Sequence, residues 1–240
     1  MLYDILLSNL NRRKLIALLI DPDKHSMDSL AKTIDIAHDA GIAFFLFGGS
    51  IISNHLPGAI DTIKQHTDKP VFLFPGSLLQ LSCQADGIFF LSLISGRNPE
   101  LLIGNHVQAA PFLKKSNLEI IPVGYILMGA SGHTSVEYMS QTMPIPFGKA
   151  DIAVATAIAG EMLGLKAIYM EAGSGAEQHI PGYVVENVKN NLSVPLILGG
   201  GIRTPQQVEF LFNSGADVLV IGSAAEQDPH ILTEMAKSIR

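Results

Sequence analysis

Residues 195–202 read PLILGGGI and residues 218–223 read VLVIGS, so two short apolar runs each pass directly into glycine. Runs of this length that are rich in Val, Ile and Leu are typical of strands buried on both faces of a parallel sheet. Between the two runs, Thr204-Pro205 is a helix-start signal and Gly215 is a helix-stop signal. The stretch therefore predicts a strand–helix–strand unit with glycine at the carboxyl end of each strand.

The same alternation of strand and helix signals extends back to the start of the chain. Eight such units in 240 residues predict a single (β/α)8 TIM-type barrel domain over residues 1–240. The alternative is an open doubly wound sheet, which usually has a glycine-rich turn after its first strand. Here the first run ends in Asp21-Pro22-Asp23-Lys24, without glycine, which favours the barrel. The eight predicted strands are Leu15–Ile20, Ala43–Phe47, Val71–Phe74, Gly87–Leu93, Leu118–Leu127, Lys166–Met170, Pro195–Leu198 and Val218–Ile221.

Helix boundaries are marked by capping residues. Ser26 is an N-cap for a helix that stops at Gly41, and Asp228-Pro229 is expected to open the last helix. The longest irregular stretch is residues 129–149, which we expect to be a lid or substrate-shaping loop, the alternative being a surface insertion without a role. His133 lies in this stretch and is a candidate for substrate contact.

Composition limits the classes of function. Hydrophobic residues make up 48% and charged residues 16% of the chain, which argues against disorder. A net charge of -6 argues against a nucleic-acid function. No apolar run approaches the ~20 residues that span a bilayer, and the N-terminus has no secretory signal. The single cysteine, Cys83, excludes an intrachain disulfide and suits a cytoplasmic location.

Glycine follows the sixth, seventh and eighth predicted strands, and these clusters predict a phosphate site. They are Gly173-Ser174-Gly175, Gly199-Gly200-Gly201 and Gly222-Ser223. Glycine lets backbone N–H groups turn toward an anion and lets a phosphate approach without meeting a Cβ atom. TIM-type barrels commonly bind phosphate with the loops after their last strands. The alternative is that the glycines only end strands.

Two carboxylates are candidates for chemistry. Tyr169 and Glu171 fall on the same side of their strand, so Glu171 is expected to face the pocket and accept a hydroxyl proton. Alternatively, Glu171 is a surface carboxylate and Tyr169 a core ring. Asp21 ends the first strand and Ser50 follows the second, and together they are candidates to hold Mg²⁺. Asp21-Pro22 is equally well read as a simple turn.

These motifs together resemble the geranylgeranylglyceryl phosphate synthase family, which includes the heptaprenylglyceryl phosphate synthases. The resemblance runs from the first predicted strand to the last, and Tyr169–Gly175 is its most specific part. The matching stretches are Leu19–Lys24, Gly48–Ser50, Tyr169–Gly175, Leu198–Arg203 and Val220–Ser223.

The resemblance implies a prenyltransferase that joins sn-glycerol 1-phosphate to a polyprenyl diphosphate, most readily a geranylgeranyl one, through an ether at C3 of the glycerol. It implies Mg²⁺ held by Asp21 and Ser50, with Glu171 and Tyr169 as catalytic residues and Glu171 as the base. The implied substrate-binding residues are Tyr169, Met170, Glu171, Ala172, Gly173, Ser174, Gly175, Gly200, Gly201, Gly222 and Ser223.

The chain departs from the family pattern at three positions. Some members have lysine where this chain has Leu19, so the phosphate must find a positive partner elsewhere. Some have Thr and Asn at the positions of Ser50 and Ser223. These differences look like a subgroup signature and leave the prenyl chain length open.

A prenyl tail needs an apolar groove, and because the product is a lipid phosphate we expect transient membrane contact. Barrels of this kind often associate, so we also expect a homo-oligomer. Two alternatives stay open: another phosphate-binding barrel enzyme of small-molecule biosynthesis, and a non-catalytic binder of a phosphorylated metabolite. The binder would keep the glycine clusters without needing Asp21 or Glu171. Aromatic and aliphatic residues of the third and fourth strands could line the groove, although the core also requires such residues: Phe72, Phe74, Phe89, Phe90, Leu91 and Leu93.

Overall fold

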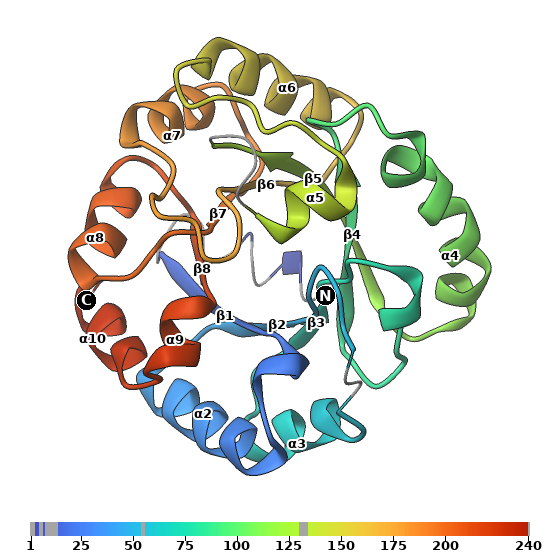
Figure 1. Ribbon diagram of the computed structural model, residues 1–240, viewed down its shortest axis with the longest axis vertical. Helices are drawn as coiled ribbons and strands as arrows, with labels where there is room; N and C mark the ends of the chain where they lie inside the picture. The colour runs from blue at the N-terminus through green and yellow to red at the C-terminus, as the bar shows by residue number, and fades with distance from the viewer. Residues whose placement is uncertain (1–2, 5–6, 8–13, 54–55, 130–133, 240) are drawn as a thin grey trace.

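The computed structural model of the protein describes residues 3–4, 7, 14–53, 56–129 and 134–239. Its eight parallel strands pair in chain order and close into a barrel that is surrounded by helices (Figure 1). The predicted TIM-type barrel is therefore confirmed. The strands are β1 Leu15–Ile20, β2 Phe44–Phe47, β3 Val71–Leu73, β4 Gly87–Leu93, β5 Glu119–Leu127, β6 Ala167–Glu171, β7 Leu196–Gly199 and β8 Val218–Ile221.

Two strands of the barrel run one residue further than predicted, at the place where the site lies. β6 continues through Glu171 because the Met128 N–H donates to the Glu171 carbonyl at 2.8 Å. β7 continues through Gly199 because the Ala172 N–H donates to its carbonyl at 3.0 Å. The backbone of Glu171 is thus held by the sheet on both sides.

The helices cover the outside of the barrel and begin at the predicted caps. Ser26 accepts a hydrogen bond from the Ser29 N–H at 3.2 Å, and the helix stops at Gly41 with a left-handed φ of 84°. The helices and helical turns are η1 Pro22–Lys24, α2 Met27–Ala40, α3 Ala59–His66, η2 Leu78–Gln80, η3 Glu100–Gly104, α4 Asn105–Lys115, α5 Ser135–Ser140, α6 Ala150–Met162, α7 Gly182–Lys189, α8 Pro205–Asn213, α9 Ser223–Gln227 and α10 Ile231–Lys237.

The last helix begins later than predicted. Asp228 ends the short helix α9, and its carboxylate accepts a hydrogen bond from the His230 N–H at 3.0 Å. α10 starts only at Ile231. The Asp-Pro pair therefore forms the turn between two helices, because the sequence contains an additional short helix directly after β8.

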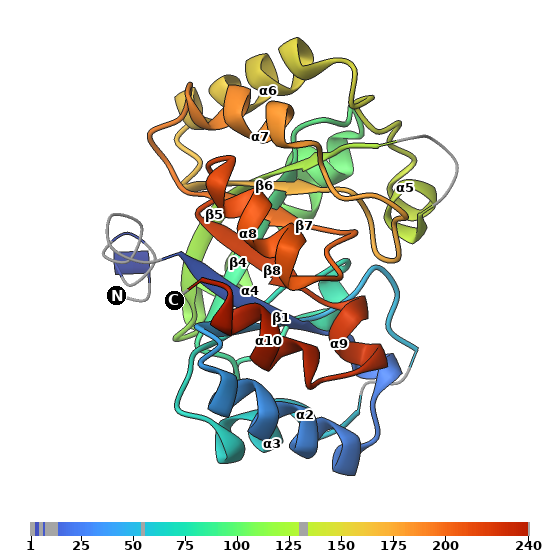
Figure 2. The same cartoon turned by 90° about the vertical axis from the view of Figure 1, so that its left-hand side faces the viewer.

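The described part of the long stretch after β5 contains a helix that was not predicted. It contains α5, which is capped by Thr134, and Ile145 pairs with Met128 in an isolated bridge. The Gly129 N–H also donates to the Ile145 carbonyl at 3.0 Å. His133 lies outside the described residues. This stretch therefore brings α5 to the end of the barrel where the carboxyl ends of the strands lie (Figure 2).

The barrel interior is filled by side chains. Phe44 and Phe72 meet edge to face at a ring distance of 5.5 Å, and Phe72 and Phe89 are 5.4 Å apart. Phe72 is buried and lines no part of the cavity at the carboxyl ends of the strands, so it belongs to the core and not to a groove. A second apolar layer lies between the strands and the outer helices. Burial of each large apolar side chain contributes roughly 1.5–3 kcal/mol to stability.

The two ends of the barrel differ in chemistry. At the amino ends of the strands, the buried Asp217 accepts hydrogen bonds from Lys189 at 2.6 Å and from the Leu196 N–H at 2.8 Å. The Tyr3 hydroxyl donates to the Lys166 carbonyl, just before β6. These contacts close one end, and the carboxyl ends of the strands are left to form a site.

Candidate active site

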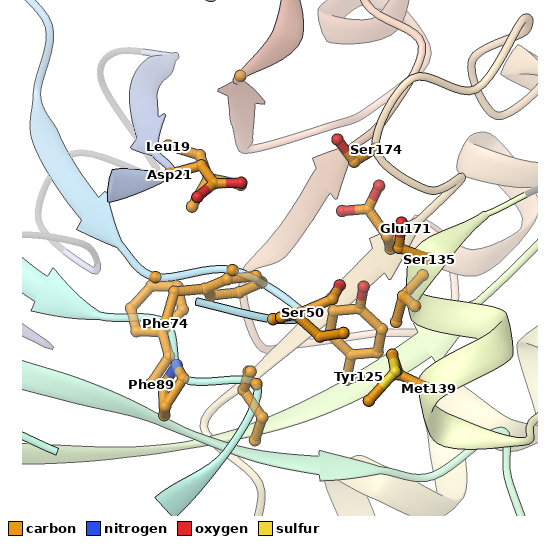
Figure 3. Close-up of a pocket in the computed structure, with 18 of the residues that line it drawn as sticks. Leu19, Asp21, Ser50, Phe74, Phe89, Tyr125, Ser135, Met139, Glu171 and Ser174 are labelled. Carbon is orange, nitrogen blue, oxygen red and sulfur yellow. The ribbon is translucent and has the colours of Figure 1, made fainter. Parts of the chain in front are cut away.

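One cavity of about 720 Å³ opens at the carboxyl ends of the strands. It is lined by the residues predicted for both carboxylate sites, Asp21, Ser50, Tyr169 and Glu171. Asp21 projects from the end of β1 and Glu171 from the end of β6, and the two enter the same space from different sides (Figure 3). The fold therefore brings together residues that are 150 positions apart in the sequence.

The glycine clusters after β6, β7 and β8 lie along one side of this cavity. Ser174, Gly175, Gly200, Gly201, Gly222 and Ser223 all line it. The hydroxyl oxygens of Ser174 and Ser223 are 3.4 Å apart, so the loops after β6 and β8 meet. Among the described residues, the N–H groups of Gly175 and Gly201 have no hydrogen-bond partner. Such amides are available to an anion.

Three of the predicted substrate-binding residues do not line the cavity. Met170 and Ala172 are buried in the apolar layer between the strands and the outer helices. Gly173 turns the chain instead: its φ is 102°, and a Cβ atom there would overlap the side chain of Thr134. Its N–H donates to the Glu171 carboxylate at 2.7 Å. Gly173 therefore acts on the position of Glu171.

Glu171 is a buried carboxylate with an unusual pKa. It is 6% exposed, and burial raises its pKa from 4.5 to about 7. The Gly173 N–H and the Tyr169 hydroxyl both favour the ionised form and oppose part of this rise. A carboxyl group that titrates near neutral pH is suited to accept and release a proton.

Tyr169 lies fully buried beside Glu171 and stacks on Tyr125, with ring centres 5.3 Å apart and planes 10° apart. Burial, and then the nearby Glu171 charge, raise the pKa of both tyrosines well above their usual value. The Tyr169 hydroxyl meets no described group in good hydrogen-bond geometry. A buried hydroxyl without a well-aligned hydrogen bond at a cavity wall is expected where a ligand completes the site.

Gly199 makes this arrangement possible. A Cβ atom there would overlap the Tyr169 hydroxyl and lie 2.6 Å from the Glu171 carboxylate. Only glycine leaves room for both polar groups at the end of β7.

Asp21 forms the opposite wall with Ser50. Its carboxylate accepts the Asp23 N–H at 3.0 Å, and burial raises its pKa. Gly49 packs against it, since a Cβ atom there would lie 3.4 Å from the Asp21 carboxyl carbon. Within the described ranges there is no group of three or more His, Cys, Asp or Glu side chains that could hold a metal ion. The protein alone therefore offers a hard cation few ligands.

Glu226, on α9, also lines the cavity, and no sequence pattern pointed to it. Burial raises its pKa, and so does the charge of Asp21. Its position depends on the helix directly after β8, which was not predicted.

Gln80, in η2, is a second residue that sequence reasoning missed. Its side-chain oxygen accepts the N–H groups of Gly49 and Gly76, at 3.3 and 3.1 Å, and its nitrogen donates to the Gly49 carbonyl at 2.8 Å. One side chain thus joins the loops after β2 and β3, and so fixes the loop that carries Ser50. No local pattern marks the contact with Gly49, because that residue lies 31 positions away in the sequence.

The rest of the cavity wall is apolar. Five of the six residues considered for a groove line it, all except Phe72: Phe74, Phe89, Phe90, Leu91 and Leu93. Leu101 from η3 and Val136 and Met139 from α5 extend this wall. The Thr134-x-x-Glu137 capping pattern was a signal that could have located α5. No helix among the described residues is long and apolar enough to cross a membrane.

Comparisons with known proteins agree with this geometry. The model of the PcrB family matches residues 8–239. A geranylgeranylglyceryl phosphate synthase of Spirosoma linguale is 44% identical over 96% of this chain and 93% of its own length. The protein of the same name in Chitinophaga pinensis is 45% identical over 94% of this chain and 90% of its own.

A solved structure shares the whole fold. It is the (S)-3-O-geranylgeranylglyceryl phosphate synthase of Thermoplasma acidophilum in complex with its substrate sn-glycerol-1-phosphate. It superposes with a TM-score of 0.95 at 34% identity, and the match covers 100% of this chain and 98% of that one.

Proposed function

Because the chain belongs to the PcrB family, we propose that it is a prenyltransferase that joins geranylgeranyl diphosphate to the C3 hydroxyl of sn-glycerol 1-phosphate. The observation that carries the proposal is the position of Glu171. This buried carboxyl group, with a pKa of about 7, lies between a wall of free backbone amides and a wall of apolar side chains.

The glycerol phosphate group fits the amide wall. Gly175, Gly200, Gly201 and Gly222 present backbone to the cavity, and Ser174 and Ser223 add hydroxyl groups. Amide and hydroxyl donors bind a phosphate without requiring a cluster of positive side chains. The glycerol end of the substrate then points toward Glu171 and Tyr169.

Glu171 is the base. The oxygen of the C3 hydroxyl forms a bond to the allylic carbon, the bond from that carbon to diphosphate breaks, and the hydroxyl proton passes to the Glu171 carboxylate. The Tyr169 hydroxyl lies close to Glu171 but forms no well-aligned hydrogen bond with it, so it is placed to donate to a glycerol oxygen and hold it in position.

Asp21 and Ser50 are the residues that would hold Mg²⁺. Two protein oxygens suit this ion, because Mg²⁺ keeps several waters and is completed by substrate phosphates. When bound, it would stabilise the negative charge of the leaving diphosphate. Gln80 keeps Ser50 in place through the Gly49 backbone.

The prenyl tail is assigned to the apolar wall formed by β4, η3 and α5. A cavity of about 720 Å³ lies within the usual range of roughly 300–1,000 Å³ for small-molecule sites. A non-catalytic binder of a phosphorylated metabolite would need neither this wall nor a buried carboxyl group beside the phosphate.

The test is incubation of the pure protein with labelled glycerol 1-phosphate, Mg²⁺ and a ladder of prenyl diphosphates. We expect organic-extractable label, greatest with the geranylgeranyl substrate. Label extracted with none of them would contradict the proposal. Asp21→Asn and Glu171→Gln separate enzyme from binder, since a binder keeps its function in both.

We also propose that the enzyme is cytoplasmic and meets its lipid substrate at a membrane surface. Ile51, Leu79 and Met139 line the cavity, yet are 56%, 81% and 49% exposed, so they form an apolar rim. Leu79→Ser should reduce sedimentation with zwitterionic vesicles, and unchanged sedimentation would contradict this contact.

Homo-oligomer formation remains a prediction. Ile103 and Val107, one helical turn apart, are 59% and 64% exposed and offer an apolar face for a second copy. Light scattering that gives the mass of one chain at micromolar concentration would contradict it.

A further inference from the structure

Arg203 joins two of the glycine loops that form the amide wall. It directly follows Gly199-Gly200-Gly201-Ile202, and its guanidinium donates to three carbonyls of the loop after β6. The distances are 3.0 Å to Glu177, 2.6 Å to Ala176 and 3.3 Å to Gly175. Arg203 also lines the cavity.

The loop after β6 needs such a contact. It contains Gly173 and Gly175, both with positive φ, and glycine gives the unfolded chain much conformational freedom. In a trans peptide the carbonyl and the following N–H point in opposite directions. Carbonyls held toward Arg203 therefore fix the direction of the amides in this loop.

Arg203 is itself held in place. Its own N–H donates to the Gln207 side chain at 2.7 Å, and Gln207 belongs to the capping box at the start of α8. The two loops also pack tightly, because a Cβ atom on Gly201 would overlap the backbone of Gln178. The capped start of α8 thus holds Arg203, and Arg203 in turn positions the glycine-containing loop after β6.

We infer that Arg203 is a positioning residue for the glycerol phosphate site, and that its charge at the cavity lining also makes that wall more positive. A planar guanidinium is able to reach several carbonyls at once, which a lysine ammonium on a flexible stem does less well. This inference rests on the proposed function. It predicts that changes at Arg203 weaken the binding of glycerol 1-phosphate and have little effect on the binding of the prenyl diphosphate.

The experiment compares Arg203→Ala and Arg203→Lys with the wild type. Binding of glycerol 1-phosphate alone is measured by calorimetry, and the KM of each substrate is measured with the other saturating. We expect Arg203→Ala to weaken the binding of glycerol 1-phosphate about 10- to 100-fold, because charge-assisted hydrogen bonds are lost. Arg203→Lys should fall between Ala and wild type, and kcat and the KM of the prenyl diphosphate should change less than about threefold.

Arg97→Ala is the matched control. Arg97 is also exposed and donates to backbone carbonyls, those of Gly96 at 2.7 Å and Ile94 at 3.4 Å, but it does not line the cavity. It should leave both KM values unchanged.

Wild-type affinity in both Arg203 variants, or an equal loss for both substrates in a folded variant, would overturn the inference. If Arg203→Ala does not fold, Arg203→Lys alone decides by the same criterion. A wild-type protein that binds no glycerol 1-phosphate overturns the proposed function as well, whereas wild-type binding with unaffected variants overturns only the role of Arg203.

Discussion

The two walls of the cavity are built from different parts of the chain. The wall after β6, β7 and β8 presents backbone amides, set by glycines whose conformations other residues rarely adopt. The wall around β1 to β4 and α5 presents side chains, namely Asp21, Ser50 and a set of apolar residues. Backbone amides need no rotamer to be selected, so the first wall is formed before a ligand arrives. The second wall depends on side-chain packing.

Glu171, at the boundary of the two walls, carries the largest predicted effect. Glu171→Gln keeps the size of the side chain and its ability to accept the Gly173 N–H. We expect kcat to fall about 10²- to 10⁴-fold, the usual contribution of a general base. Binding of glycerol 1-phosphate should change little.

The control for this variant is Glu186→Gln, on the exposed side of α7. If Glu171→Gln retains more than a tenth of wild-type kcat, the carboxylate is not the base, and the boundary between the walls has no chemical role.

The pKa of Glu171 also predicts how stability depends on pH. Its folded pKa, about 7, is above the ordinary 4.5, so the folded state holds a proton that the unfolded state has lost between these values. The stabilising contribution is complete below about pH 4.5 and is lost as pH rises through 7. Its size is at most about 3 kcal/mol.

Urea unfolding between pH 5 and 8 measures this contribution. The stability of Glu171→Gln relative to wild type should increase over this range, because glutamine does not ionise. A constant difference between the two proteins would show that Glu171 titrates normally.

Two glycines of the amide wall test how closely the loops after β6 and β7 must approach each other. Gly200 and Gly175 have similar φ values, 84° and 75°. A Cβ atom on Gly200 would overlap the Glu171 carboxylate and lie 2.8 Å from the Gly173 nitrogen, whereas one on Gly175 meets nothing within 4 Å. Gly175→Ala should cost only the left-handed strain of roughly 1–2 kcal/mol.

Gly200→Ala should weaken the binding of glycerol 1-phosphate by about a further 10-fold relative to Gly175→Ala, because overpacking adds to the strain of the left-handed backbone. Calorimetry on both variants checks this. Equal losses would mean that close approach of the loops after β6 and β7 is unimportant.

In the other wall, Gln80→Ala should raise the KM of the prenyl diphosphate about 5- to 10-fold, since one to two net hydrogen bonds to the Ser50 loop are lost. The KM of glycerol 1-phosphate should not change. Gln84→Ala, a nearby glutamine outside the cavity, is the control. A rise in both KM values would mean that Gln80 supports the barrel as a whole.

The same contrast explains what the sequence could predict. The strands, the glycine clusters and the inward direction of Glu171 follow from local patterns, because period-two alternation and glycine at strand ends are properties of adjacent residues. Gln80, Arg203 and Glu226 escaped prediction. Arg203 acts through carbonyls 26 to 28 residues away, and Gln80 joins its own loop to the Gly49 backbone 31 residues away. Glu226 depends on a short helix that was not predicted.

Removal of divalent metal tests the division between the two walls most directly. Calorimetric titrations of glycerol 1-phosphate and, separately, of a prenyl diphosphate are compared with and without a chelator. The amide wall needs no metal, so the affinity for glycerol 1-phosphate should agree within about twofold in the two conditions. The affinity for the prenyl diphosphate should fall at least about 10-fold when Asp21 and Ser50 hold no Mg²⁺. If the chelator weakens the binding of both ligands equally, or of neither, then the two walls do not bind the two substrates separately.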